Sequence, residues 1–97
     1  YEAIYWKELD TYPDNYIGRK LQVTGRASQI NSSTEMNAYY GGTYEMFYVI
    51  SDVPFSGIYE NTGFTVYGTV YGKHCGSNAL GGTVCLTVID ADLIEKN

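Results

Sequence analysis

The sequence predicts an all-β protein, a small five-stranded Greek-key barrel preceded by a short N-terminal helix. Apolar and polar residues alternate along several runs, which is typical of half-buried strands. Eleven glycines and two prolines interrupt a chain of 97 residues, so turns are frequent. A chain of this length buries one core. We therefore expect residues 1–97 to form a single domain.

The helix is expected at about residues 3–12. Tyr5, Leu9 and Tyr12 follow the i, i+4, i+7 spacing of one helical face, and the proline that follows ends the helix. A helix this short is marginal alone in water. We therefore expect its tyrosine face to dock on the barrel and close one end.

Five strands are expected after the helix. The first, at about 21–30, carries Gly25 in mid-strand and loses its alternation at Ile30. This pattern predicts a bulge near Ser28 and Gln29 in a sharply coiled strand. The other strands are expected at about 36–40, 44–53, 64–72 and 83–94. The buried faces of 44–53 stay open, because its apolar residues are nearly continuous.

The last two strands form a long hairpin around a polar, glycine-rich tip. Alternation puts one set of first-arm residues toward the core, namely Phe64, Val66, Gly68 and Val70. It puts the other set outside, namely Thr65, Tyr67, Thr69 and Tyr71. The second arm places Val84, Leu86 and Val88 on one face and Thr83, Cys85, Thr87 and Ile89 on the other. A kink is expected at residues 90–92.

Cys75 and Cys85 lie on opposite arms near the tip, and both have outer parity. This arrangement predicts a disulfide, which would stabilise the fold by about 2.5–3 kcal/mol and implies an oxidising, extracellular or cell-surface location. The alternative is two free thiols in a cytosolic protein. Together with His74 they supply three metal ligands at most, and neighbours on a strand point apart, so we expect no metal.

The net charge is −5, and the six lysines and arginines are scattered, with only Arg19 and Lys20 adjacent. Nucleic-acid affinity depends on clustered cations, so DNA or RNA binding is disfavoured without being excluded. No apolar run is as long as a membrane span, and we expect no membrane insertion. Because the chain begins at Tyr1, we expect one domain of a longer protein, with any targeting signal outside it.

The sequence contains no recognisable catalytic pattern. His74 is the only histidine, and it cannot converge with the neighbouring cysteine on a strand. Asp90 and Asp92 are expected to be solvated residues at the kink. Phosphate-binding, dinucleotide-binding and nucleophile-elbow motifs are absent from the sequence. We therefore predict a protein that is not an enzyme and has no cofactor.

Tyrosines form the candidate ligand-binding surface. Aromatic rings stack on bases and equally on sugar faces. The candidate residues are Tyr39, Tyr40, Tyr44, Tyr48, Tyr67 and Tyr71. The alternative is that most of these rings are strand formers that cover a small core.

Several segments resemble a known family. YWKELDTYPDNYIGRKLQVTGRASQI, then FTVYGTVYG, LGGTV and VIDADLIE, are similar to OB-fold domains of the tRNA-anti-like type, which occur in uncharacterised exported proteins and lipoproteins of Gram-positive bacteria. The resemblance covers most of the chain, is loose over 31–59, and departs at the cysteine-bearing segment 73–78. It implies an OB-like barrel and brings no catalytic residues. Most OB-folds carry their helix between the third and fourth strands, whereas here it is N-terminal. A small β-sandwich or an SH3-like barrel is the alternative fold.

Three functions remain open. The first is a non-catalytic binding module of an exported, possibly lipoprotein-anchored protein, with a glycan or a protein partner as ligand. The second is a single-stranded nucleic-acid-binding domain, and the third is a structural spacer without a ligand. The acidic charge and the predicted disulfide favour the first, and the sequence leaves the oligomeric state open.

Overall fold

The fold is described from a computed structural model of the chain, for residues 1–77 and 81–97. A two-residue strand, β1 (Glu2–Ala3), comes first and is followed by α1 (Trp6–Thr11) and a 3-10 turn, η1 (Pro13–Tyr16). The remaining strands are β2 (Lys20–Ser32), β3 (Glu35–Tyr40), β4 (Met46–Ser51), β5 (Gly63–Ser77) and β6 (Thr83–Lys96).

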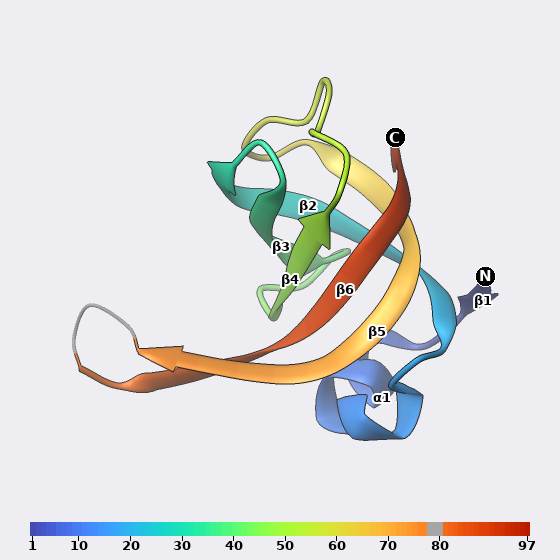
Figure 1. Cartoon of the computed structure of the whole chain (residues 1–97), viewed down its shortest axis with the longest axis vertical. Helices are drawn as coiled ribbons and strands as arrows, with labels where there is room; N and C mark the ends of the chain where they lie inside the picture. Colours follow the sequence, from blue (N-terminus) through green and yellow to red (C-terminus); the bar gives the residue numbers. More distant parts are fainter. Residues whose placement is uncertain (78–80) are drawn as a thin grey trace.

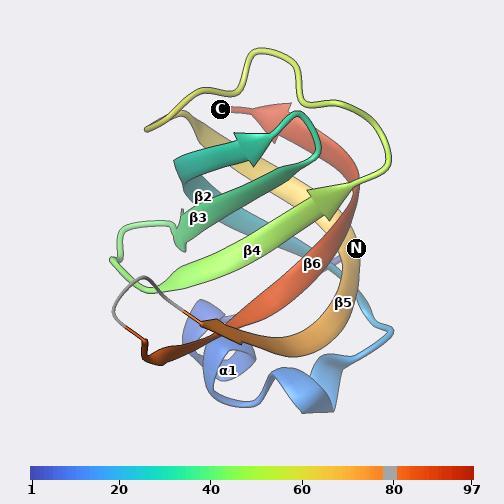
Figure 2. The same ribbon diagram turned by 60° about the vertical axis from the view of Figure 1, so that its left-hand side comes forward.

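Strands β2 to β6 close into a barrel (Figures 1 and 2). Their order is β2-β3-β4-β6-β5, and β2 also pairs with β5, which joins the two ends of the sheet. The β4–β6 pair is parallel, and the other barrel pairs are antiparallel. The predicted five-stranded, OB-like Greek-key barrel is confirmed. The closing pair excludes an open two-sheet sandwich.

The barrel interior is filled by the inward-facing residues of all five strands. Three aromatic rings occupy its centre: Phe47 is stacked on Tyr40 at 4.6 Å between ring centroids and lies 6.4 Å from Phe64. A Cβ atom at Gly25 would come within 2.9 Å of the Phe47 ring. The glycine therefore lets β2 bend closely around this ring. The predicted bulge is also confirmed, because the β2–β3 register shifts at Ser28.

Helix α1 covers one end of the barrel, as expected (Figure 2), but it docks through a different face. Tyr5 and Tyr12 are largely exposed, whereas Leu9 is buried in the core. Trp6 is partly buried and stacks on Tyr40 with 5.4 Å between ring centroids. The helix begins only at Trp6, so its buried stripe runs through Trp6 and Leu9 instead of the tyrosines.

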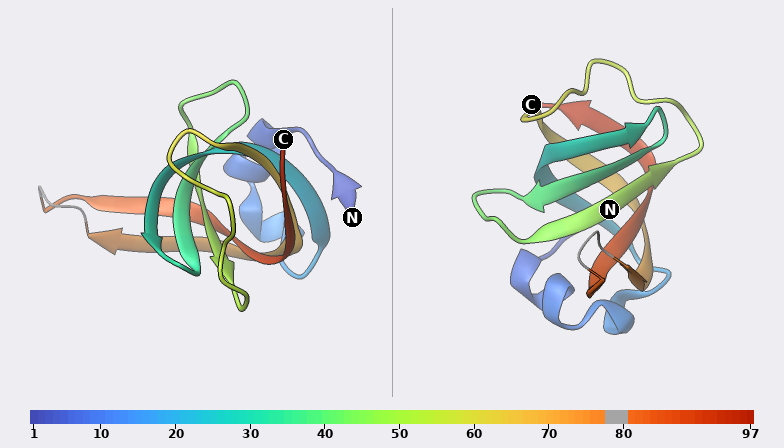
Figure 3. Two further views of the ribbon diagram at one scale, coloured as in Figure 1. Left: turned by 90° about the horizontal axis from the view of Figure 1, so that it is seen from above. Right: turned by 90° about the vertical axis from the view of Figure 1, so that its left-hand side faces the viewer.

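The final hairpin is longer than predicted. Strands β5 and β6 remain paired as far as Ser77 and Thr83, so five residues expected in the polar tip belong to β5. Residues 72–77 and 83–86 extend beyond the pairing with β2 and β4; we call them the projecting arm (Figure 3). The predicted tip also includes residues 78–80, which lie outside the described residues.

The predicted disulfide is confirmed. Cys75 and Cys85 are directly opposite each other in the arm and are bonded, with their Cα atoms 4.0 Å apart. Their predicted position on the outer face is wrong. Thr87 and Ile89 share the parity of Cys85 and are only 1% and 0% exposed, so this side of β6 faces the barrel interior.

A bulge in β5 explains why the two cysteines lie on the opposite face from the predicted one. The register of β5 against β6 shifts between Val70 and Gly72, which leaves Tyr71 as the extra residue. A shift of one residue turns every later side chain to the opposite face of a strand. Gly72 allows this bulge because its φ is +102°, and a Cβ there would lie 2.9 Å from the side chain of Ile17.

Candidate functional site

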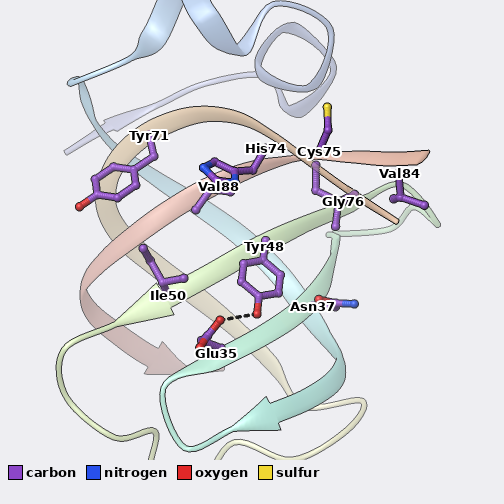
Figure 4. A pocket seen from close by; sticks show the side chains of 11 residues that line it. Glu35, Asn37, Tyr48, Ile50, Tyr71, His74, Cys75, Gly76, Val84 and Val88 are labelled. Carbon is purple, nitrogen blue, oxygen red and sulfur yellow. Dashed lines mark hydrogen bonds between the residues drawn. The ribbon is translucent and has the colours of Figure 1, made fainter. Parts of the chain in front are cut away.

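A groove of about 580 Å³ lies on the outside of the barrel, where the projecting arm meets β3 and β4 (Figure 4). The groove-lining residues come from β3 to β6. They are Glu35, Asn37, Tyr48, Ile50, Tyr71, His74, Cys75, Gly76, Val84, Leu86 and Val88. In Figure 4 the sulfur of Cys75 points away from Tyr48, so the disulfide supports the arm from its other face.

The floor of the groove is aliphatic because alternation along β6 is the reverse of the predicted one. Thr87 and Ile89 face the core, which turns Val84, Leu86 and Val88 outward. Val88 is 5% exposed although it faces out. Val84 remains 42% exposed. An open apolar surface bordered by polar residues is typical of an interaction site.

Two tyrosines form the walls. Tyr48 pairs with Val88 across the parallel β4–β6 ladder, and its hydroxyl donates a hydrogen bond of 2.6 Å to Glu35 Oε1. The pKa of Tyr48 is raised, first by burial and then by this bond to Glu35. Tyr71, the bulged residue of β5, keeps the outward position predicted by alternation and lines the groove. The negative charge of Asp90 is the largest cause of its raised pKa.

The charged side chains at the groove are acidic. Glu35 lines the groove, and the negative charges of Asp90 and Asp52 both raise the pKa of Tyr71. None of the groove-lining residues is lysine or arginine. Lys73, the arm's only lysine among the described residues, shares the face of Thr87 and acts on Asp10 of α1. A cation that entered the groove would therefore meet carboxylates and no competing lysine or arginine.

His74 lines the groove, and Cys75 and Cys85 are joined in the disulfide. Within residues 1–77 and 81–97, no group of three or more His, Cys, Asp and Glu side chains could hold a metal ion. Asp92 is an extra residue in the β5–β6 ladder, in the segment where a kink was predicted, and it accepts hydrogen bonds from Tyr1 (2.7 Å) and Lys20 (3.1 Å).

Of the six predicted tyrosines, Tyr48 and Tyr71 line the groove. Tyr39 and Tyr44 form a separate aromatic pair, with 5.8 Å between their ring centroids. The guanidinium of Arg26 lies 4.7 Å from the Tyr39 centroid and 5.9 Å from that of Tyr44. Tyr39 is on the outer face of β3, which also carries the groove residues Glu35 and Asn37, and Tyr44 lies in the connection between β3 and β4.

The remaining two tyrosines lie elsewhere. Tyr67 packs edge-on against Tyr1, with 5.5 Å between ring centroids, and is not among the groove-lining residues. Tyr40 is fully buried in the core between Trp6 and Phe47. Tyr40 therefore belongs to the barrel interior and is not part of the surface.

The sequence did not identify the aliphatic floor or the carboxylates of the groove. The alternation of Val84, Leu86 and Val88 was visible, but it indicated a core-facing row. The bulge at Tyr71, which would have reversed that assignment, has no clear sequence signal apart from the following glycine.

No protein-family model, curated protein or solved structure matches this chain. The resemblance to OB-fold domains of the tRNA-anti-like type therefore stays a prediction, whereas the barrel itself is observed. Among the described residues, no helix is long and apolar enough to cross a membrane.

Proposed function

We propose that this chain is a non-catalytic binding module that holds its ligand, a glycan or a protein partner, in the groove. One observation carries the proposal: an aliphatic floor faces outward beside a barrel whose own core is complete. The groove volume of about 580 Å³ lies within the range of about 300–1,000 Å³ that is common for binding sites. Val84 and Leu86 lie outside the core cluster, although Val88 between them and the barrel is buried.

The position of the groove supports the same proposal. In OB-like barrels, ligands bind across the second and third strands and the neighbouring loops. Here β3 and β4 are the second and third barrel strands, and the β5–β6 arm forms the far side of the groove. The disulfide supports an extracellular or cell-surface location, because such bonds persist in oxidising compartments.

Single-stranded nucleic acid is the second candidate, favoured by one observation. Arg26 lies over two tyrosine rings, and such rings can stack on bases. However, a phosphate backbone requires several cations, and the adjacent groove presents carboxylates instead. A structural spacer without a ligand is the third candidate, and it predicts that nothing binds.

The test compares the wild-type protein with Val84→Asp on a glycan array and an immobilised peptide library. Leu93→Asp is the matched control, because Leu93 is a similarly exposed residue (54% against 42%) on the same strand outside the groove. We expect a bound glycan or peptide whose affinity falls at least about tenfold, or about 1.4 kcal/mol, in Val84→Asp alone.

A circular-dichroism spectrum and a melting curve for each variant check the fold. Ligands whose affinity is the same for Val84→Asp and wild type would contradict the groove as the site. Salt-dependent binding of a labelled single-stranded oligonucleotide would favour the second candidate. No binding in any assay would favour the spacer.

A further inference from the structure

From the charges around the groove, we infer that its ligand is an extended peptide of a partner protein in which a lysine or arginine is followed by an aliphatic residue. This inference rests on the proposed function and selects one ligand class for the same site. Two features of the groove carry it, namely its floor and the order of charges along it.

The floor favours a peptide over a glycan. Sugars are held by many hydrogen bonds to polar side chains, whereas this floor consists of aliphatic side chains. The few polar groups at its edge are partly occupied already. Glu35 accepts the hydrogen bond of Tyr48, and the side-chain Oδ1 of Asn37 accepts one of 3.2 Å from the side-chain amide of Asn31. An aliphatic side chain of a partner would gain more here than a hydroxyl-rich ring.

The strand register places the charges at one end. Ile50 pairs with Glu35 on one side and with Asp90 on the other, so two carboxyl-bearing residues flank it in a single row across β3, β4 and β6. Asp52 follows two residues after Ile50, and its charge also reaches Tyr71. We call Glu35, Asp52 and Asp90 the acidic end.

The other end of the groove is apolar. From the row of Asp90, β6 runs back through Val88 and Leu86 to Val84 in the arm. Six residues of strand span about 20 Å at about 3.3 Å each. An extended peptide of about six residues therefore fits this length, with its cation at the acidic end and its aliphatic side chain on Leu86 or Val84.

The charge of the partner follows from the same geometry. With no lysine or arginine among the groove-lining residues, a cationic side chain meets only opposite charge, and a carboxylate of the partner meets only like charge. Such complementarity chiefly sets specificity and association rate, and it is screened by salt. Binding of the cationic peptide should therefore weaken as salt rises.

The experiment measures fluorescence anisotropy with three labelled peptides of about ten residues. Each carries a leucine four positions after a variable residue, so that both side chains lie on the same face of the extended peptide. The variable residue is arginine, the uncharged isostere citrulline, or glutamate. We expect affinity in the order arginine, citrulline, glutamate. In the double variant Glu35→Gln/Asp90→Asn, the arginine peptide should bind at least about tenfold more weakly, and the citrulline peptide should be nearly unaffected.

Glu95→Gln is the matched control, since it removes one carboxylate from β6 outside the groove. The Glu35→Gln change keeps a carbonyl acceptor for the Tyr48 hydroxyl, so the wall of the groove is preserved. If Glu95→Gln lost as much affinity for the arginine peptide as the double variant, the loss would be due to net charge and not to the groove. That result would overturn the inference.

Two further outcomes separate this inference from the proposed function. If citrulline or glutamate peptides, or a glycan, bind as well as or better than the arginine peptide and are lost in Val84→Asp, the groove is a binding site but the cationic-peptide inference is wrong. If no peptide and no glycan binds the wild-type protein, both the inference and the proposed function are wrong.

Discussion

Strands β5 and β6 run through both the barrel and the projecting arm, but the surroundings of their side chains differ between the two regions. In the barrel, buried residues alternate with half-buried ones along β5, as for Val66 and Val70 against Thr65. In the arm both faces are open: Lys73 is exposed on one and His74 on the other. Aliphatic residues in the barrel are accounted for by the core. Those of the arm have no such partner, which is why they indicate a ligand.

The sharpest contrast should come from truncating one apolar side chain in each region. Phe47→Ala removes a fully buried ring at the centre of the barrel and should lower the free energy of unfolding by about 3–5 kcal/mol. Leu86→Ala removes a half-buried side chain at the base of the arm. It should cost about 1 kcal/mol, a fraction of the transfer free energy of a fully buried leucine.

Urea denaturation monitored by circular dichroism measures both free energies of unfolding. The dependence of this free energy on urea concentration should be the same for both variants, which checks that they unfold in the same way. Equal losses for the two variants would mean that Leu86 belongs to the core. In that case the distinction between a barrel that supplies stability and an arm that does not would be wrong. The aliphatic residues of the groove floor would then be explained by their contribution to stability alone.

The disulfide should matter less than the core ring and should act mainly on the arm. Cys75→Ser/Cys85→Ser opens a loop with a sequence separation of 10, and the chain-entropy estimate gives a loss of about 2.5–3 kcal/mol in unfolding free energy. Amide hydrogen exchange should accelerate in residues 72–77 far more than in β2. Reduction of the wild-type protein is the matched control and should reproduce both results. Uniform acceleration across β2 to β6 would show that the arm and barrel open together.

The same contrast separates what the sequence could predict from what it could not. Alternation in the first half of β5 reflects burial, so Phe64, Val66 and Val70 were assigned to the core from the pattern alone, and all three are buried. The pairing of the cysteines was also predictable, because it needs only that both share a face. Which face they share depends on the bulge at Tyr71, and a single extra residue reverses every later assignment.

The groove could not be predicted for a related reason. Its acidic end depends on the parallel β4–β6 register, which aligns Ile50 with Asp90 across a long separation in sequence. The faces of β4 were left open because its apolar residues run nearly without interruption. Inward Phe47 and Val49 and outward Tyr48 and Ile50 are all apolar or aromatic, because β4 is covered by the core on one side and lines the groove on the other.

The smallest predicted effect concerns the junction where β6 passes from the arm into the barrel. Here the hydroxyls of Tyr40 and Thr87 are buried, and neither makes a hydrogen bond of good geometry to a described residue, although Thr87 and Asp10 lie near the Tyr40 hydroxyl. Burial is the largest cause of the raised pKa of Tyr40. Tyr40→Phe removes a buried unpaired hydroxyl and keeps the ring between Trp6 and Phe47, so it should stabilise the fold by about 1 kcal/mol at neutral pH.

The pH dependence provides a second readout of the same substitution. Because the folded-state pKa of Tyr40 lies above the unfolded value of about 10, its neutral form stabilises the fold below that pH, and this contribution is lost as pH rises through the folded-state pKa. The gap in unfolding free energy between Tyr40→Phe and wild type should therefore widen above about pH 10. Tyr44→Phe, at an exposed position, should follow the wild type throughout. A Tyr40→Phe variant less stable than wild type at neutral pH would mean that the hydroxyl is satisfied, for example by a buried water shared with Thr87, and that the junction is as completely bonded as the rest of the barrel.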